Sequence, residues 1–233
     1  MNKDLELENY LSISPNKFGL YLFDKKNLKN LYKEELIIKE DNKSLNLDDL
    51  KKFLDDNIFK IEKLSGKLVE NIFIIFENKK IFNLKIGIKK KNYNISITKK
   101  YLENLLIESK DLFRENYHDQ EIMHMIINKY FFNNISYQSF QENLKCDNFA
   151  LEIEFKFISN NIIYDLNKVL ENYQIKIVRY IDGSYVKNII NDDLEISEMT
   201  HKILTGYNEN EVTFTPKNIK KLGFFEKFFQ LFS

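Results

Sequence analysis

The sequence predicts an α+β protein in which much of the strand pairing is antiparallel. Segments with alternating apolar residues, typical of half-buried strands, come in groups. Between the groups, apolar residues recur every three or four positions, as in amphipathic helices. The resulting order is strands, helix, strands, helix, strands, helix and strand, which differs from the regular alternation of a Rossmann series. With 43% hydrophobic and 30% charged residues, the 233-residue chain has the composition of a globular protein with a sizeable core.

The first part of the chain predicts three strands and a helix. Residues 11–23 alternate in polarity on both sides of Pro15 and predict a β-hairpin, and residues 31–38 predict a third strand. A helix is predicted over residues 46–66, which open with an asparagine that can cap the helix and close with a glycine that can end it.

The middle of the chain alternates between predicted strands and helices. Strands are predicted at 71–77, 81–90, 121–132, 149–158 and 175–181, and helices at 98–113, 162–173 and 185–190. In the strand at 149–158 every second residue is apolar, so we expect one buried face and one face in water. Beyond residue 190 the pattern weakens, and we expect a mostly polar linker with one short helix near residues 196–204.

The sequence contains no pattern that predicts an active site. Its six glycines lie too far apart to form a phosphate-binding loop, and its three histidines lack the spacing of metal ligands. His124 falls in an apolar strand, where we expect packing. The single cysteine, Cys146, has no histidine near it in sequence, so we expect no nucleophilic role. A chain with one cysteine cannot form an internal disulfide bond, which fits a reducing cytoplasm. We therefore expect no enzyme, no cofactor and no metal site, and the zero net charge predicts no nucleic-acid partner.

Residues 217–233 predict an amphipathic helix with a sharp division between an apolar and a polar face. The apolar half consists of Leu222, Phe224, Phe225, Phe228, Phe229, Leu231 and Phe232, and the basic residues are Lys217, Lys220, Lys221 and Lys227. These four lysines oppose the single Glu226, which gives 4 − 1 = +3. Each buried phenylalanine gains roughly 1.5–3 kcal/mol, and each lysine near anionic lipid gains about 1 kcal/mol. We therefore expect this segment to bind an anionic membrane surface.

Two other roles fit the same amphipathic pattern. The helix could pack on its own domain, or it could dock into the groove of a partner protein. The polar stretch before Pro216 and the preference for phenylalanine over leucine or alanine favour the membrane.

Several segments of the chain resemble the FtsA family, actin-like proteins that tether the bacterial division ring to the membrane. The segments "EIMHMIINKYFFNN" (121–134), "FALEIEFKFIS" (149–159) and "NNIIYDLNKVLENYQIKIVRYIDGSYVKNI" (160–189) resemble the successive strands and helix of the family's SHS2-type subdomain. The tail resembles the family's C-terminal membrane-targeting helix.

The stretch "LSISPNKF" (11–18) lies where the FtsA family has its first phosphate motif. Lys17 corresponds to the lysine of that motif, whereas Ser12 and Ser14 replace its aspartate and first glycine. The family's second phosphate loop has no counterpart after Asn191. The resemblance therefore implies an FtsA-like protein that keeps the interaction subdomain and the membrane anchor and has lost the nucleotide site.

This resemblance implies a domain plan of four parts. They are an N-terminal hairpin and strand remaining from an actin-like lobe (1–45), an SHS2-like α+β interaction domain (46–190), a linker (191–216) and a C-terminal amphipathic membrane-targeting helix (217–233). The first ten residues are acidic and have no apolar stretch, so we expect no secretory signal and a place in the cytoplasm, peripheral on the inner face of the cell membrane.

The expected function is that of a non-enzymatic, membrane-associated adaptor of bacterial cell division. Its partners would be other division proteins and an anionic lipid surface, and self-association stays open. One alternative is a soluble interaction module of an actin-like pilus or secretion assembly platform, which would bind a partner and no lipid. Another is a degenerate actin-like protein that still binds ATP, against which the missing glycine loops argue.

Overall fold

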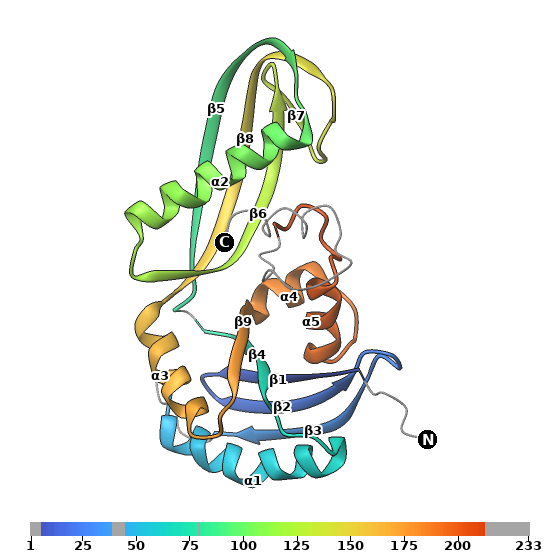
Figure 1. The fold of residues 1–233 in the computed structure, drawn as a ribbon, viewed down its shortest axis with the longest axis vertical. Helices are drawn as coiled ribbons and strands as arrows, with labels where there is room; N and C mark the ends of the chain where they lie inside the picture. Colours follow the sequence, from blue (N-terminus) through green and yellow to red (C-terminus); the bar gives the residue numbers. More distant parts are fainter. Residues whose placement is uncertain (1–5, 39–44, 79, 213–233) are drawn as a thin grey trace. The chain divides into compact units, whose positions relative to one another are not determined.

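The computed structural model describes residues 6–38, 45–78 and 80–212, and these residues fold into two compact units (Figure 1). The first unit combines residues up to Ile81 with Ser159–Tyr207, and the second combines Phe82–Ile158 with the segment that starts at Asn208. The second unit is thus inserted into the chain of the first. Strands and helices occur in both units, so the fold is α+β, as predicted.

A five-stranded mixed sheet forms the centre of the first unit, with the strand order β3-β2-β1-β4-β9. The strands are β1 (Leu7–Ser14), β2 (Lys17–Asp24), β3 (Lys29–Ile37), β4 (Asn71–Phe76) and β9 (Lys176–Asp182). The antiparallel pair β1 and β2 places Ile13 opposite Phe18, which confirms the hairpin predicted at Pro15. By contrast, β1 pairs with β4, and β4 with β9, in parallel.

Four helices belong to the first unit, and they cover both faces of its sheet. They are α1 (Leu47–Ser65), α3 (Asn160–Glu171), α4 (Gly183–Ile189) and α5 (Ile196–Leu204). The ring of Phe18 lies 6.1 Å from that of Phe53 on α1, and the ring of Phe23 lies 5.1 Å from that of His201 on α5. Because Phe18 and Phe23 are an odd number of positions apart in β2, their side chains leave opposite faces of the sheet. The helices α1 and α5 therefore lie on opposite faces, which explains why β2 is buried along almost its whole length.

The caps of α1 agree with the sequence prediction. The side chain of Asn46 accepts hydrogen bonds from the backbone N–H groups of Asp48 and Asp49. At the other end Gly66 has a φ of 69°, a left-handed conformation that favours glycine, and its N–H bonds to the carbonyl of Glu62.

The second unit is a four-stranded sheet with one helix packed on one face. Its elements are β5 (Phe82–Ser96), α2 (Lys99–Asn116), β6 (Gln120–Phe132), β7 (Ile135–Tyr137) and β8 (Lys145–Ser159), in the strand order β5-β8-β6-β7. As predicted, Leu151, Ile153 and Phe155 of β8 are buried, and they pack in one core with Leu105 and Phe113 of α2. The acidic and basic side chains between them lie on the other face.

The division into units differs from the predicted domain plan. Residues 1–45 are not a separate remnant, and 46–190 do not form one domain, because α1, β4, α3, β9 and α4 all belong to the same unit as β1–β3. The reason is the parallel pairing of β4 with β1 and of β9 with β4. Parallel partners are joined by long crossovers, so they leave no local turn signal in the sequence. For the same reason β4 and β5, although consecutive, belong to different sheets.

The segment predicted as a linker, 191–216, is part of the fold as far as residue 212. The helix α5 confirms the predicted short helix, but its Ile196, Met199 and Ile203 are buried and it packs on β2 and β3. Further on, the backbone N–H of Val212 bonds to the carbonyl of Met125 in β6. The membrane-targeting helix predicted at 217–233 lies outside the described residues.

Candidate functional site

One edge of the first unit is the natural place for a ligand, because three parallel strands end there. In the strand register Ile13 of β1 lies beside Phe76 of β4, and Phe76 lies beside Asp182 of β9. In sheets with parallel strands, ligands bind just beyond the carboxyl ends of those strands. The stretch 11–18, which lies where the FtsA family has its first phosphate motif but lacks the aspartate and first glycine of that motif, falls at the same edge.

The hairpin loop at this edge is held by its own side chains. The hydroxyl of Ser14, which stands in place of the motif's first glycine, donates to the carbonyl oxygen of Lys17 at 3.1 Å. The ammonium of Lys17 lies 3.0 Å from a carboxylate oxygen of Glu35 on β3, and the hydroxyl of Tyr21 donates to the same oxygen at 2.6 Å. The one lysine that corresponds to the phosphate motif is therefore paired with an acid of its own sheet.

The ionisation of Glu35 follows from these contacts. Burial alone would raise the pKa of this carboxyl, but the hydrogen bonds from Tyr21 and Lys17, together with the charges of Lys17 and Lys33, lower it below its usual value. Burial, followed by the hydrogen bond to Glu35, raises the pKa of Tyr21. The carboxylate is thus charged and the phenol neutral at physiological pH, which keeps the pair with Lys17 intact.

At the carboxyl ends of β4 and β9, the acidic side chains are likewise bound to neighbouring groups of the protein. Glu77, the residue after β4, accepts a hydrogen bond from the ammonium of Lys187 on α4 at 2.6 Å. Gly183 packs so closely against this glutamate that a Cβ atom on it would lie 2.4 Å from the Cγ of Glu77. A carboxylate oxygen of Asp182 accepts the backbone N–H of Ser184 at 2.9 Å and so caps α4.

These contacts decide whether this edge of the sheet can bind a phosphate group. A phosphate group at the end of parallel strands is bound by free backbone N–H groups of a glycine loop and by an unpaired lysine or arginine. Here Lys17 and Lys187 each have a glutamate within 3.0 Å, and the side chains of Ser14 and Asp182 bond to the backbone of their own loops. The edge is arranged to hold strands and helix together.

Two histidine–glutamate pairs, one partly buried and one almost fully buried, connect the last described part of the chain to the sheets. In the first unit, Nδ1 of His201 on α5 lies 2.8 Å from a carboxylate oxygen of Glu8 on β1, and the hydroxyl of Tyr10 donates to the same oxygen. Burial would raise the pKa of Glu8, but the hydrogen bonds from His201 and Tyr10 and the charge of Lys25 lower it overall. The pair fixes α5 on its sheet.

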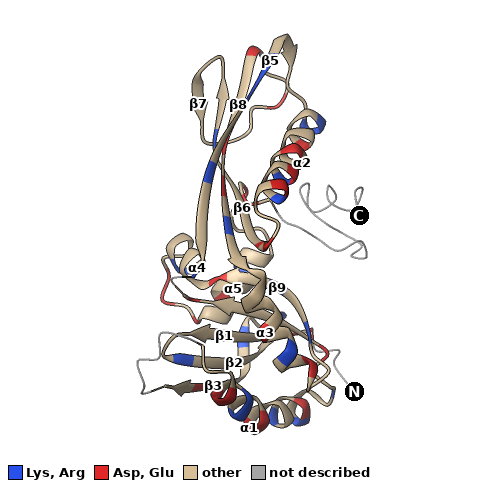
Figure 2. Ribbon diagram, turned by 90° about the vertical axis from the view of Figure 1, so that its left-hand side faces the viewer, with Lys and Arg blue, Asp and Glu red and all other residues tan. Residues whose placement is uncertain are grey.

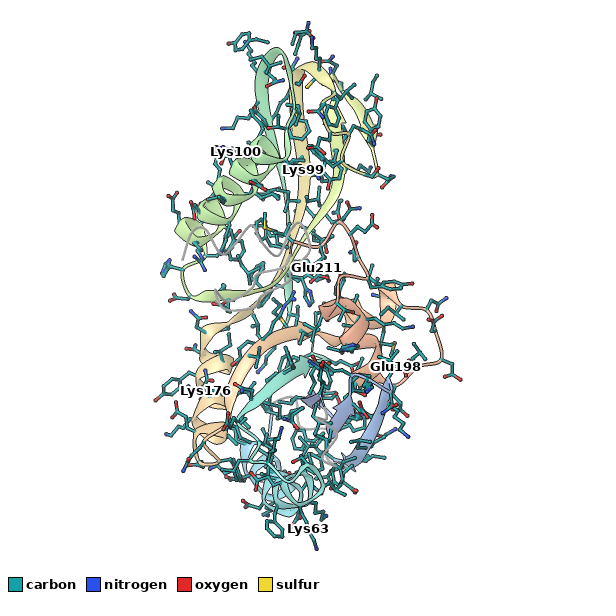
Figure 3. All side chains as sticks on the ribbon, turned by 45° about the vertical axis from the view of Figure 1, so that its right-hand side comes forward. Lys63, Lys99, Lys100, Lys176, Glu198 and Glu211 are labelled. Atoms are coloured by element: carbon teal, nitrogen blue, oxygen red, sulfur yellow. The ribbon has the colours of Figure 1, made fainter. Side chains whose placement is uncertain are left out.

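The second pair lies in the second unit. Nδ1 of His124 on β6 lies 2.8 Å from a carboxylate oxygen of Glu211, which is labelled in Figure 3, and the side chains of both residues are almost fully buried. His124 is packed in the strand, as the sequence predicts, although its acidic partner comes from the segment predicted as a linker. Reasoning from sequence missed this contact, since the two residues are far apart in the chain and an isolated glutamate in a polar stretch gives no signal.

The single cysteine, Cys146, is packed in the core of the second unit. Cys146 is buried, and its burial raises the pKa of the thiol, although a hydrogen bond from Asn92 partly opposes this effect. A raised pKa lowers the thiolate fraction that nucleophilic chemistry needs. Within the described ranges no group of three or more histidine, cysteine or acidic side chains could hold a metal ion.

The residues predicted to bind a membrane all lie beyond residue 212, outside the part of the chain that the structure describes. Within that part, no helix is both long and apolar enough to cross a bilayer.

Comparisons with known proteins give similarities of fold. No protein-family model and no curated protein matches the chain. Among solved structures it is similar to the PilM-PilN type IV pilus biogenesis complex, with a TM-score of 0.47 and 8% identity over 77% of this chain and 48% of that one. It is also similar to the cytoplasmic domain of EpsL, an inner membrane component of the type II secretion system of Vibrio cholerae, with a TM-score of 0.37 and 6% identity over 78% and 57% of the two chains.

A third solved structure is a Bacteroides thetaiotaomicron protein with an actin-like ATPase fold and unknown function. Its TM-score is 0.36 and its identity 12%, over 80% of this chain and 57% of that one. The chain spans about half the length of the solved structures that it matches. These similarities concern the fold alone.

Proposed function

We propose that this protein is a non-enzymatic adaptor, which binds protein partners through its α+β units and is held at the inner face of a bacterial cell membrane by its C-terminal segment. The observation that carries the non-enzymatic part is the closed edge of the first unit. Lys17 at the start of β2 and Lys187 on α4, two basic residues near the ends of the parallel strands, are paired with Glu35 and Glu77 at 3.0 and 2.6 Å. A nucleotide would have to separate both pairs and would find no glycine loop in return.

Calorimetric titration of the full chain with ATP and magnesium tests this part. We expect no saturable heat at millimolar nucleotide. The variants Glu35→Gln and Glu77→Gln release the two lysines, and comparing them with the unaltered chain shows whether the ion pairs alone keep phosphate away. Saturable one-to-one binding by the unaltered chain, weakened by Lys17→Ala, would mean that a working nucleotide site survives, and the non-enzymatic proposal would be wrong.

The membrane part of the proposal rests on the sequence of residues 217–233. Seven of their eight large apolar residues, all except Ile219, share one face, and their four lysines against one glutamate give the segment a charge of +3, the pattern of a helix that lies in an anionic membrane surface. Phe228 is in the middle of the apolar face, and Phe228→Glu places a charge where the bilayer would be. This variant is therefore expected to lose vesicle binding and to keep the two folded units.

We further propose, from the resemblance to the FtsA family, that the partners belong to the cell-division machinery. A fluorescent fusion of the full chain, made in the bacterium that carries its gene, is expected to gather at mid-cell. A fusion that spreads evenly through the cytoplasm would contradict this. Gathering at pilus or secretion assemblies, with loss of the signal when those assemblies are deleted, would identify the chain as a module of such a platform.

A further inference from the structure

The second unit has one long strand that is paired on one side only, as far as the described residues go. In the strand order β5-β8-β6-β7, β5 is an edge strand, and in the described part of the chain it is hydrogen-bonded to β8 alone. It has 15 residues, well above the usual strand length of about 5–6. In an antiparallel pair, every second residue directs its N–H and C=O groups away from the partner strand. The outer side of β5 therefore offers a long row of backbone donors and acceptors.

The helix of this unit covers a face of the sheet and does not cover the edge of β5. Leu84, Ile86 and Ile88 of β5 point to the helix side, because they pack against the core that α2 closes. Lys90 points the same way and makes an ion pair with Glu108 of α2 at 2.6 Å. Access to the edge of β5 is thus lateral, in the plane of the sheet.

The opposite face of β5 has a hollow in its middle. Gly87 faces this side between Lys85 and Lys89, and a Cβ atom added to it would meet nothing within 4 Å. With Ala150 of β8 and the ring of Phe131, these residues line a shallow hollow of about 480 Å³. An added strand would place one of its side chains beside Gly87, where a large ring would cover the bare backbone.

The charge of β5 restricts what can pair with it. The strand contains Lys85, Lys89, Lys90 and Lys91 and no acidic residue, and Figure 2 shows lysines in blue along the strands of this unit. Like charges on neighbouring strands destabilise pairing, so β5 of a second copy is a poor partner. By the same charge argument, the basic segment 217–233 of the same chain would be a poor partner.

We propose that the free edge of β5 binds an extended, acidic segment of a partner protein as an additional strand, with an aromatic side chain of that segment over Gly87. The backbone groups of β5 provide the hydrogen bonds. Lys89 and Lys91, together with Lys85, which remains exposed although its ammonium lies 3.6 Å from a carboxylate oxygen of Glu154 on β8, select for acidic residues at alternate positions. Lysines on an edge strand discourage strand pairing in general, whereas opposite charges on neighbouring strands favour it, so the same residues give the site its specificity for an acidic strand.

Synthetic peptides test this interaction on the full chain. The probe is a ten-residue fluorescent peptide of β-forming residues with glutamates at alternate positions and one central phenylalanine. Two matched probes replace either the glutamates with lysines or the phenylalanine with alanine. In fluorescence polarisation we expect the acidic aromatic probe to bind, the alanine probe to bind up to about fivefold more weakly, and the lysine probe not to bind.

Variants of β5 locate the binding to this edge. The triple change Lys85→Glu, Lys89→Glu and Lys91→Glu is expected to reverse the preference towards the lysine probe. Gly87→Tyr fills the hollow and is expected to remove the advantage of the phenylalanine. Lys100→Glu, which reverses the charge of one lysine in the exposed N-terminal turn of α2, is expected to leave binding unchanged. Hydrogen exchange should show new protection in β5 when the acidic probe is bound.

Three results would overturn the proposal. The first is equal binding of all probes. The second is binding of the acidic probe with no added protection in β5 and no response to the triple variant. The third is a dimer in sedimentation experiments whose formation protects β5, because the edge would then serve a second copy of the chain.

Discussion

Replacement of Gly183 by alanine tests how closely α4 packs against Glu77 at the edge of the first sheet. The added methyl group would lie 2.4 Å from Cγ of Glu77 and 3.0 Å from a methyl group of Ile75. In a helix alanine is favoured over glycine by about 1 kcal/mol, but forcing an extra carbon into a packed site costs about 1–3 kcal/mol. The first contact is far below any normal carbon–carbon distance, so we expect Gly183→Ala to lower the free energy of unfolding despite the gain in helix propensity.

A double-mutant cycle identifies the contact responsible. Glu77→Ala removes the atom that the methyl group would meet first, so Gly183→Ala should cost about 1 kcal/mol less in that background than in the unaltered chain. Gly87→Ala is the matched control, since nothing lies within 4 Å of a Cβ atom there and its change should stay within about 0.5 kcal/mol.

The assay is equilibrium unfolding in urea, with circular dichroism as the signal and the same slope required for every variant. A Gly183→Ala variant as stable as Gly87→Ala would refute the close packing. A cost that persists unchanged in the Glu77→Ala background would refute Glu77 as its cause.

Three further predictions concern stability. Ile203→Ala in α5 should lower the free energy of unfolding by about 2–4 kcal/mol, because its side chain is buried. Lys202→Ala on the same helix should change it by less than about 0.5 kcal/mol. Equal effects of the two variants in urea unfolding would mean that α5 is not packed on the sheet. Asn46→Ala should cost about 1 kcal/mol by loss of the α1 cap, and an unchanged urea midpoint would argue against that cap. Because folding lowers the pKa of Glu8 below its ordinary value of 4.5, its contribution is present above that pH and lost below it. Glu8→Gln should therefore be less stable than the unaltered chain at pH 7, and the difference should shrink as the pH falls below 4.5; a constant difference would contradict this.

Features of the fold that depend on neighbouring residues could be predicted from the sequence. The hairpin around Pro15, the caps of α1 at Asn46 and Gly66, and the alternate burial of β8 all follow from local periodicity and residue type. Each of these signals is contained within a few residues, and tertiary contacts do not override it.

Features that depend on distant segments could not be predicted in this way. The parallel pairs that unite β1, β4 and β9 join residues that are far apart in sequence, and an inserted unit separates the last two. The segment predicted as a linker is polar overall. Its Glu211 is nevertheless buried, because its carboxylate pairs with the imidazole of His124 on β6. Polarity indicates exposure on average, but a paired acid and base can be buried together.

The candidate site shows the same limit. The sequence indicated that Ser14 replaces a glycine of the phosphate motif and that Lys17 remains, which left the nucleotide question open. It gave no sign that Glu35, on another strand, pairs with Lys17, or that Glu77 pairs with Lys187. These pairs follow from strand register and from the position of α4, which become known only with the fold.

Co-sedimentation with vesicles tests the adaptor function most directly. The full chain, a chain ending at Pro216 and the Phe228→Glu variant are each mixed with vesicles that contain anionic lipid, at low and at high salt, and circular dichroism checks that all three are folded. We predict that only the full chain pellets with the vesicles and that salt weakens its binding, because both the apolar face and the lysines contribute. If all three stay in the supernatant and the shortened chain unfolds, the C-terminal segment belongs to the core and the proposed membrane adaptor is contradicted.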